Sequence, residues 1–431
     1  MQFHIILCKV GDGMTGKRVG SVKVRYVFVD LLIVFWFVRQ AIEFIFEYMG
    51  NSQISPYVNI VVTVFTYATS VAGIVVSLRK ELVKEVFFIA TGLIILLACN
   101  YMIYPENISS IQTVARMTVT TLPCYILVRS IPNALRIISV MDYISCLIIP
   151  AVAYIQAAGL NQAVDNYLIV SYSILPCMIV LIGLLYQQFR FRRVICVIIG
   201  CLTLMIYGGR LPLLLLVLSI LLFELKAYTK NKKQIKTLLK YIVCSVMILI
   251  VALNISNIKS FVLQKYESQN TYSRILTRIF EADLFDLSGR DDLFKSSIKL
   301  IRKNPVLGNG IGSDTTMIIK ERLYTPDYVL SNGGGLSVHN GILEFAMEFG
   351  LIALAAAVSL LWRICVCAFK QVNYGYDFIF LVLLLGVGIF RTIFGYPYWY
   401  NHAFWMGIAW CVTIYKQCHA RQTARADSKE E

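Results

Sequence analysis

Residues 167–187 read YLIVSYSILPCMIVLIGLLYQ, a run without a single charged side chain. A helix of about 20 apolar residues is long enough to cross the hydrocarbon core of a bilayer. Runs of this kind recur along the chain, and only 15% of its 431 residues are charged. Soluble domains contain about 25% charged residues, so the composition argues against a soluble enzyme, a nucleic-acid-binding protein and a disordered scaffold.

Twelve such runs predict an all-α, polytopic integral membrane protein with about 12 transmembrane helices and one large extracytoplasmic loop. The chain shows no strand alternation, and in lipid a helix satisfies its own backbone hydrogen bonds, so helices rather than a barrel are expected. The predicted spans are 25–46, 57–78, 85–104, 109–128, 134–157, 167–187, 193–209, 211–226, 240–257, 341–362, 377–395 and 400–416.

The charge distribution orients these spans. The formal net charge is +15, and 25 of the 40 lysines and arginines fall in segments that are cytoplasmic if the N-terminus is inside. The short loops on the other side hold none, as the positive-inside rule requires. Both termini are therefore expected in the cytoplasm, and the basic charge needs no nucleic acid to explain it. The basic start leads directly into a span, so we interpret it as a retained anchor rather than a cleaved signal peptide.

Five segments follow from this topology. A cytoplasmic tail (1–24) precedes a nine-helix membrane bundle (25–257), an extracytoplasmic loop (258–340), a three-helix bundle (341–416) and a second cytoplasmic tail (417–431).

The long loop contains an expected amphipathic helix. Ser288 and Asp291 form a variant capping box, and Asn304-Pro305 stops the helix. Apolar residues line one face between these signals and charged residues line another. The helix either lies on the membrane surface or across the mouth of the bundle, or it packs beneath the rest of the loop.

Four arginines lie outside both the cytoplasmic segments and the large loop: Arg39, Arg116, Arg210 and Arg391. An arginine inside a bilayer costs about 2.5–3.5 kcal/mol on insertion scales, so it suggests a ligand or a pathway. Guanidinium groups at the outer interface suit a polyanion, because they bind phosphate through two hydrogen bonds. The alternative is that each snorkels or pairs singly, as Arg39 could with Glu43. For Arg210 we favour function, because two neighbouring glycines let a ligand approach the backbone.

His339 is the candidate proton acceptor. Of the four histidines only His339 and His402 lie outside the cytoplasm on this topology, and His339-Asn340 stands where the large loop re-enters the membrane. Histidine is suited to proton transfer near neutral pH, although a single histidine at a helix start is more often structural. Glu344 and Glu348 follow on the next helix, where they could orient His339, bind a hydroxyl or pair within the bundle.

Three other patterns receive simpler interpretations. The glycine-rich stretch 308–312 lacks the spacing and the lysine of a phosphate-binding loop, so we expect a turn. The aromatic residues of 396–400 are typical of an interfacial belt, with sugar stacking as an alternative. The twelve cysteines show neither a disulfide framework nor a metal motif.

Several motifs resemble one known family. Ser288-Gly289-Arg290-Asp291 leads to the sequence NPVLGNG at 304–310, and VHNGILE at 338–344 is followed by EFGL at 348–351. Together with Gly209-Arg210 at the start of an apolar span, this resembles the O-antigen ligase and O-antigen polymerase superfamily of bacterial surface-polysaccharide assembly. The match covers 288–351 and Arg210; elsewhere only the topology agrees, and the chain lacks a second histidine beside His339.

The resemblance implies a metal-independent glycosyltransferase of the bacterial cytoplasmic membrane that needs no cofactor. Its donor would be a polyprenyl diphosphate-linked glycan, with Arg210 and Arg290 on the diphosphate and His339 activating the acceptor hydroxyl. Five further residues are candidates for binding the diphosphate or the glycan: Arg116, Arg391, Asn340, Glu344 and Glu348. Of these, Arg116 and Arg391 rest on the topology alone and not on the resemblance.

Three functions remain open. The first is a polymerase of O-antigen, capsule or exopolysaccharide repeat units, with a chain-length regulator and a flippase as candidate partners. The second is a ligase that moves finished glycan to a lipid, protein or wall acceptor, which differs only in the acceptor. The third is a flippase or transporter, against which the absence of a visible internal repeat argues.

Overall fold

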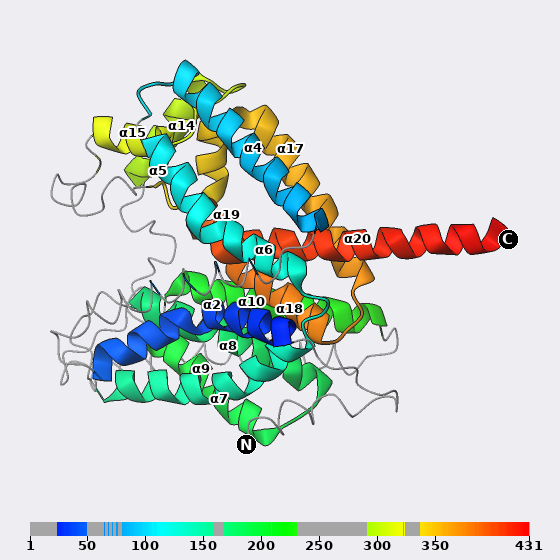
Figure 1. Cartoon of the computed structure of the whole chain (residues 1–431). Coiled ribbons are helices and arrows are strands. Elements are labelled where there is room, and N and C mark those ends of the chain that lie inside the picture. The colour runs from blue at the N-terminus through cyan, green and yellow to red at the C-terminus, as the bar shows by residue number, and fades with distance from the viewer. Residues whose placement is uncertain are drawn as a thin grey trace.

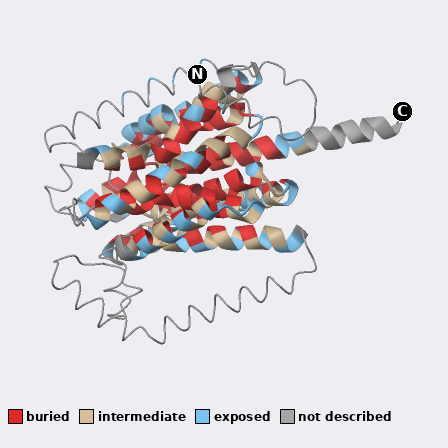
Figure 2. Ribbon diagram, turned by 90° about the horizontal axis from the view of Figure 1, so that it is seen from below, coloured by how far each residue is buried: buried red, intermediate tan, exposed pale blue. Residues whose placement is uncertain are grey.

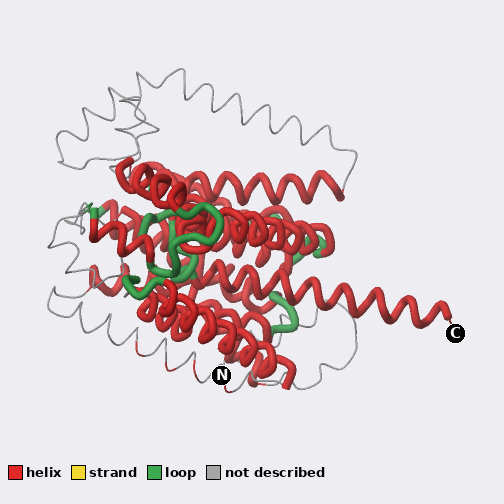
Figure 3. Tube along the Cα trace, turned by 90° about the horizontal axis from the view of Figure 1, so that it is seen from above, coloured by secondary structure: helices red, strands yellow, loops and turns green. Residues whose placement is uncertain are grey.

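The structure is a computed structural model that describes residues 24–49, 80–107, 109–158, 167–207, 209–230, 291–321 and 337–430, with single residues at 64, 68, 71, 75 and 323. Within these ranges every regular element is a helix (Figure 3). The predicted all-α fold is confirmed. The helices are α2 (Val24–Met49), α4 (Lys80–Ile103), α5 (Ser109–Arg116), α6 (Leu122–Ser130), α7 (Leu135–Ala157), α8 (Tyr167–Gln187), α9 (Phe191–Tyr207), α10 (Arg210–Lys230), α14 (Asp291–Lys303), α15 (Ser313–Lys320), α17 (Gly341–Gln371), α18 (Tyr376–Leu384), α19 (Arg391–Gly395) and α20 (His402–Glu430), with π-helical turns η1 (Met117–Thr121) and η3 (Leu385–Phe390).

Seven helical segments in the described ranges are long and apolar enough to cross a membrane, which confirms a polytopic membrane protein. They are Glu81–Ile103, Ser109–Ser130, Leu135–Ala157, Leu168–Gln187, Leu211–Thr229, Gly341–Gln371 and Tyr376–Gly395.

The other five predicted spans are not among these seven segments. Three of them coincide with α2, α9 and α20, of which α9 has only 17 residues and the other two include several charged side chains. The spans predicted at 57–78 and 240–257 lie outside the described ranges, apart from four single residues, so the number twelve stays a prediction. Helix α20 continues through the predicted tail to Glu430 and projects from the bundle (Figure 1).

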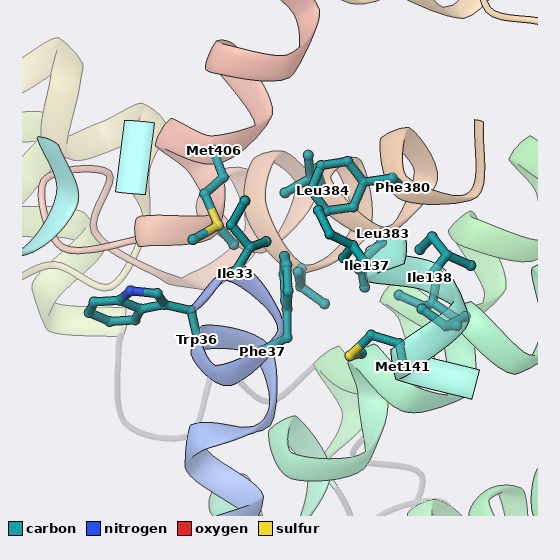
Figure 4. Close-up of a cluster of buried hydrophobic side chains, with 14 of the residues drawn as sticks. Ile33, Trp36, Phe37, Ile137, Ile138, Met141, Phe380, Leu383, Leu384 and Met406 are labelled. Atoms are coloured by element: carbon teal, nitrogen blue, oxygen red, sulfur yellow. The ribbon is translucent and has the colours of Figure 1, made fainter. Parts of the chain in front are cut away.

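The core forms around α8, which packs against α2, α7, α9, α10 and α18. Buried residues concentrate in these central helices (Figure 2). Ile33 and Phe37 of α2 meet Ile137 of α7, Phe380 of α18 and Met406 of α20 in one cluster (Figure 4). Lipid tails are as apolar as these side chains, so close van der Waals packing rather than exclusion of water holds such helices together.

Helices α10 and α17 begin at the same end of the bundle. At their ends, the Lys226 ammonium of α10 donates a 2.6 Å hydrogen bond to the Phe369 carbonyl of α17. At their starts, both helices approach Gly395 of α19. A Cβ added to Gly395 would lie 2.7 Å from Cδ2 of Leu211, the second residue of α10, and 3.9 Å from the carbonyl oxygen of His339, two residues before α17. This parallel arrangement agrees with the predicted span between them, 240–257, which lies outside the described residues.

Ion pairs gather at the helix ends that the sequence assigns to the cytoplasm. Glu85 at the start of α4 binds Arg129 at the end of α6 and Lys416 of α20, at 2.9 and 2.8 Å. Asp142 of α7 binds Arg192 and Arg193 of α9, at 2.7 and 2.8 Å. The basic residues thus cluster with acidic partners, and the side of the membrane that they face stays a prediction.

Helix α17 breaks at Gly350, and the loop 304–312 fills the break. Gly350 has φ 80° and ψ 174°, a conformation essentially reserved for glycine. Backbone nitrogens of Asn309 and Gly310 donate to the carbonyls of Met347 and Glu348, at 2.7 and 3.0 Å. The loop is a turn with left-handed glycines at 308, 310 and 312, which confirms the expectation of a turn there.

Helix α14 confirms the amphipathic helix predicted before Asn304-Pro305. Its apolar residues Leu293 and Ile301 are buried in a small cluster with Met317, Ile318 and Met347 of α15 and α17. Helix α14 therefore packs against α15 and α17, and its location relative to the membrane surface, the bundle mouth and the rest of the loop stays a prediction. Helices α14 and α15 lie near the start of α17 (Figure 1).

Candidate active site

His339 has an unusual backbone conformation directly before α17. Its φ is 55°, and it is the only non-glycine residue with a positive φ among those that the structure describes. Such a conformation costs on the order of 1–3 kcal/mol and recurs at functional sites. Asn340 is the N-cap, because its side-chain oxygen accepts hydrogen bonds from the Ile342 and Leu343 nitrogens, both at 3.1 Å. The cap fixes the direction in which α17 leaves the half-buried His339.

Arg391 lies between two tyrosine rings. Its guanidinium carbon is 3.7 Å from the ring centre of Tyr172 on α8 and 4.3 Å from that of Tyr396. The π-helical turn η3 ends immediately before it, and π-helical turns occur frequently at functional sites. The Arg391 Nε atom is buried and has no hydrogen-bond partner among the described residues. The two tyrosine rings therefore orient the Arg391 guanidinium, and no carboxylate of the described residues pairs with it.

The starts of α8, α10 and α17 converge around α19. The Gly209 backbone nitrogen donates a 2.8 Å hydrogen bond to the Ser171 hydroxyl of α8. Ser171 precedes Tyr172, which stacks on Arg391. Gly395 contacts both Leu211 and the backbone of His339. The first residue of α10 is Arg210, whose side chain lies outside the described part, and Arg290 lies outside the described residues altogether. The structure thus brings the backbone of Arg210 to the same end as His339 and Arg391.

Arg116 lies at a second π-helical turn. It is the last residue of α5, directly before η1, and its side chain is exposed. Its guanidinium carbon lies 5.7 Å from the ring centre of Tyr400. Thr113 holds that ring through a 3.1 Å hydrogen bond between the two hydroxyls. Arg116 and Arg391 therefore each stack on a tyrosine of the segment 396–400, which joins α19 to α20.

Arg39 differs from these arginines. Its Nε lies 2.6 Å from the Glu43 carboxylate one turn further along α2. This ion pair confirms the alternative in which Arg39 pairs within its own helix. His402, the other histidine expected outside, packs its ring on Trp36 with centroids 4.6 Å apart.

Glu348 is buried and accepts three hydrogen bonds from the protein. Its carboxylate binds the Gly312 nitrogen and the Trp399 indole nitrogen, both at 2.8 Å, and the Tyr398 hydroxyl. Among the roles considered for Glu348, these contacts favour pairing within the bundle. The same contacts bury Tyr398 and Trp399, at 6% and 3% exposure, so the expectation of an interfacial belt is wrong for these two residues. They turn inward because Glu348 offers them a buried acceptor.

Two further carboxyl groups lie near Glu348. Glu344 is buried, and its Oε2 atom has no hydrogen-bond partner among the described residues. Asp314 of α15 accepts hydrogen bonds from the backbone nitrogens of Thr315 and Val338, which ties α15 to the residue before His339. Burial raises the pKa of Asp314 to about 6. Burial and the negative charge of Glu348 together raise the pKa of Tyr398 well above its ordinary value.

The contacts of the predicted residues include partners that no sequence signal identifies. Tyr172 lies in an apolar run where a tyrosine is typical of a packed helix, and Thr392 and Asn401 belong to no motif.

In the described part of the chain, no group of three or more histidine, cysteine, aspartate or glutamate side chains is arranged to hold a metal ion.

Comparison with known proteins identifies one domain. Residues 194–358 match the family model described as O-antigen ligase. No curated protein matches the chain. The matched range includes Arg210, Arg290, His339, Asn340, Glu344 and Glu348, whereas Arg116 and Arg391 lie outside it. Residues 194–358 thus form a domain of the O-antigen ligase and O-antigen polymerase superfamily, as the motifs at Arg210 and at 288–351 predicted.

Proposed function

We propose that this protein is a membrane glycosyltransferase that polymerises polyprenyl diphosphate-linked repeat units of a bacterial surface polysaccharide. The observation that carries the proposal is the convergence at Gly395, where the starts of α10 and α17 meet α19. This arrangement places His339 and Arg391 at one end of a bundle that contains an O-antigen ligase domain. A proton acceptor at the same end of the bundle as guanidinium groups suits the transfer of a glycan from a diphosphate.

The arginines would bind the diphosphate of the donor. The energy of the glycosidic bond to the diphosphate drives the transfer, so no nucleotide and no metal is required on the extracytoplasmic side. Negative charge develops on the leaving diphosphate, and fixed guanidinium groups stabilise it without reorganisation. We assign this role to Arg391 together with Arg210, Arg290 and the exposed Arg116, each of which can offer two hydrogen bonds to phosphate.

His339 would activate the acceptor. The acceptor hydroxyl loses its proton to the imidazole while its oxygen bonds to the anomeric carbon of the donor. The bond between that carbon and the diphosphate oxygen breaks, and the polyprenyl diphosphate leaves. Asn340 and Glu344 would lie near the incoming glycan, whereas Glu348 supports the site through Tyr398 and Trp399.

This reaction sets the location and the partners. The substrate is embedded in the bilayer, so the enzyme would act at the outer face of the bacterial cytoplasmic membrane, with both termini in the cytoplasm. A flippase must deliver the lipid-linked repeat units to that face, and a chain-length regulator is a candidate partner.

The second candidate function is that of a ligase. The description of the matched family as O-antigen ligase favours it. The two functions share the donor and differ in the acceptor, which is another lipid-linked repeat unit for a polymerase and a lipid, protein or wall polymer for a ligase.

Deletion of the gene followed by analysis of lipid-linked glycans tests the proposal. Loss of a polymerase leaves single repeat units on the carrier at the outer face, which is the expected result. Long chains that accumulate on the carrier would indicate a ligase, and repeat units trapped at the inner face would indicate a flippase.

Point variants then test the site. His339→Ala should abolish glycan extension while the protein still accumulates in the membrane; extension to normal length would remove His339 from the reaction. Arg210→Lys should be nearly as damaging as Arg210→Ala, because an ammonium cannot form the paired hydrogen bonds of guanidinium. Full activity of the lysine variant would show that a single positive charge is sufficient.

A further inference from the structure

Asn401 occupies a buried position between three elements of the site. It directly precedes α20 and is 2% exposed. Its side-chain nitrogen donates to the Gly388 carbonyl of η3 at 3.0 Å and to the Thr392 hydroxyl of α19 at 2.9 Å. Its side-chain oxygen accepts from the Phe404 nitrogen at 3.3 Å, so the carboxamide also caps α20. One side chain therefore joins α20 to the segment that carries Arg391.

These hydrogen bonds act on the backbone on both sides of Arg391. The Gly388 carbonyl also accepts the backbone N–H of Arg391, so Asn401 and Arg391 share one acceptor. Thr392 is the next residue after Arg391. The close approach of α20 reinforces the connection, because a Cβ on Gly388 would lie 2.4 Å from the Ala403 carbonyl oxygen. The backbone at Arg391 is thus connected to a donor that directly precedes α20.

Thr392 extends the same connection to the start of α17. A Cβ on Gly341 would lie 2.5 Å from the Thr392 methyl carbon and 2.9 Å from its carbonyl oxygen. Gly341 follows Asn340 and lies two residues after His339. A displacement of Thr392 would therefore move the start of α17 as well as Arg391.

We propose that Asn401 and Thr392 are positioning residues that set the separation between Arg391 and His339. Neither residue belongs to the matched domain, and neither needs to contact the substrate. The inference rests on the proposed function, because it takes Arg391 as a diphosphate contact and His339 as the base. The proton acceptor and the charge-stabilising group must act on the same glycan at once, so an error in their separation lowers the rate of the chemical step.

The test uses paired variants of the full-length protein in liposomes with a lipid-linked repeat unit as donor and acceptor. Thr392→Val removes the acceptor of the Asn401 amide at nearly constant volume, whereas Thr392→Ser retains it. Asn401→Asp retains the cap on α20 but cannot donate. Thr203→Val is the matched control, because Thr203 is equally buried and its hydroxyl bonds only within α9, to the Ile199 carbonyl at 2.8 Å.

The expected result is a split between rate and stability. Thr392→Val and Asn401→Asp should lower kcat roughly tenfold to hundredfold, the scale of a misplacement of about 1 Å, with little change in KM. Thr392→Ser should restore most of kcat. Thr203→Val should leave kcat unchanged, even where its melting temperature falls as far as that of Thr392→Val.

Two outcomes would overturn the inference, and they differ from the failure of the proposed function. If the wild-type protein extends the glycan and His339→Ala does not, but Thr392→Val has the kcat of the wild type, the positioning role is wrong. Equal losses in Thr392→Val and Thr392→Ser would also overturn it, because the hydroxyl would then be irrelevant. If the wild-type protein transfers no glycan, the proposed function fails, and the positioning role fails with it.

Discussion

Replacing Gly350 by alanine should unfold the region on which the candidate site rests. Gly350 breaks α17 with φ 80° and ψ 174°. A Cβ at this position would lie 2.1 Å from the Val306 carbonyl oxygen and 2.5 Å from its carbon. Both atoms belong to the backbone of the loop 304–312, so no side-chain rotation can relieve the overlap.

The cost has two parts. The backbone conformation alone costs an alanine about 1–3 kcal/mol. Relief of the overlap requires the loop to move by about 1 Å, which disrupts three hydrogen bonds: Leu351 nitrogen to the Pro305 carbonyl at 2.7 Å, Asn309 nitrogen to the Met347 carbonyl at 2.7 Å and Gly310 nitrogen to the Glu348 carbonyl at 3.0 Å. At about 1 kcal/mol each, the total reaches about 4–6 kcal/mol. This is a large part of the 5–15 kcal/mol that stabilises a typical protein.

Thermal unfolding of the purified protein in detergent measures this effect, with the fraction of monodisperse protein after heating as the signal. Gly92→Ala is the control, because Gly92 lies in the interior of α4 and a Cβ there would meet no atom within 4 Å. Alanine is favoured over glycine in a helix by up to about 1 kcal/mol, so Gly92→Ala should match or exceed the wild type. A Gly350→Ala protein that accumulates normally and melts at the wild-type temperature would refute the reasoning.

Three further predictions concern the same region. Glu348→Ala should lower the melting temperature more than Glu348→Gln, since alanine leaves three buried donors unpaired at about 1–3 kcal/mol each and glutamine keeps one acceptor oxygen; equal shifts would contradict the network. Because burial raises the pKa of Asp314 from 3.8 to about 6, the folded protein binds more protons than the unfolded chain between these values. Its free energy of unfolding should therefore fall by about 3 kcal/mol as the pH rises from about 4 to about 6, and Asp314→Asn should flatten this slope, which an unchanged slope would disprove. A cysteine at the exposed Lys299 of α14 should react with an impermeant thiol reagent from outside the cell; labelling only after permeabilisation would invert the predicted topology.

The helices were predictable because their signals are local. Each confirmed span is a continuous apolar run, and α14 carries its own stop signal at Asn304-Pro305 together with an amphipathic pattern. The turn at 308–312 was predictable for the same reason, since closely spaced glycines favour left-handed backbone. The sequence also indicates His339 and Arg391 as unusual residues, through their position in the topology.

The contacts that hold these residues were not predictable, because they join segments far apart in the chain. Glu348 recruits Tyr398 and Trp399 from about 50 positions away, which turns inward two aromatic residues whose local pattern is typical of a membrane interface. The π-helical turns next to Arg116 and Arg391 have no sequence signal either. The second accepts a hydrogen bond from Asn401, which directly precedes α20.

The partners of Arg39 and Arg391 differ, and this difference bears on the diphosphate site that we propose. Arg39 lies against a carboxylate, which neutralises it, so an incoming diphosphate would have to displace Glu43. Arg391 lies between the faces of Tyr172 and Tyr396 and has no ion pair among the described residues. Aromatic faces stabilise a cation by about 0.5–2 kcal/mol without supplying a counter-charge. The positive charge of Arg391 therefore remains available to the proposed diphosphate, and the two rings already orient the guanidinium. If Arg391 only completed the packing of the bundle, an apolar side chain would fill the same space without the cost of placing a charge in the membrane. The stacked guanidinium therefore favours a binding role in the proposed function.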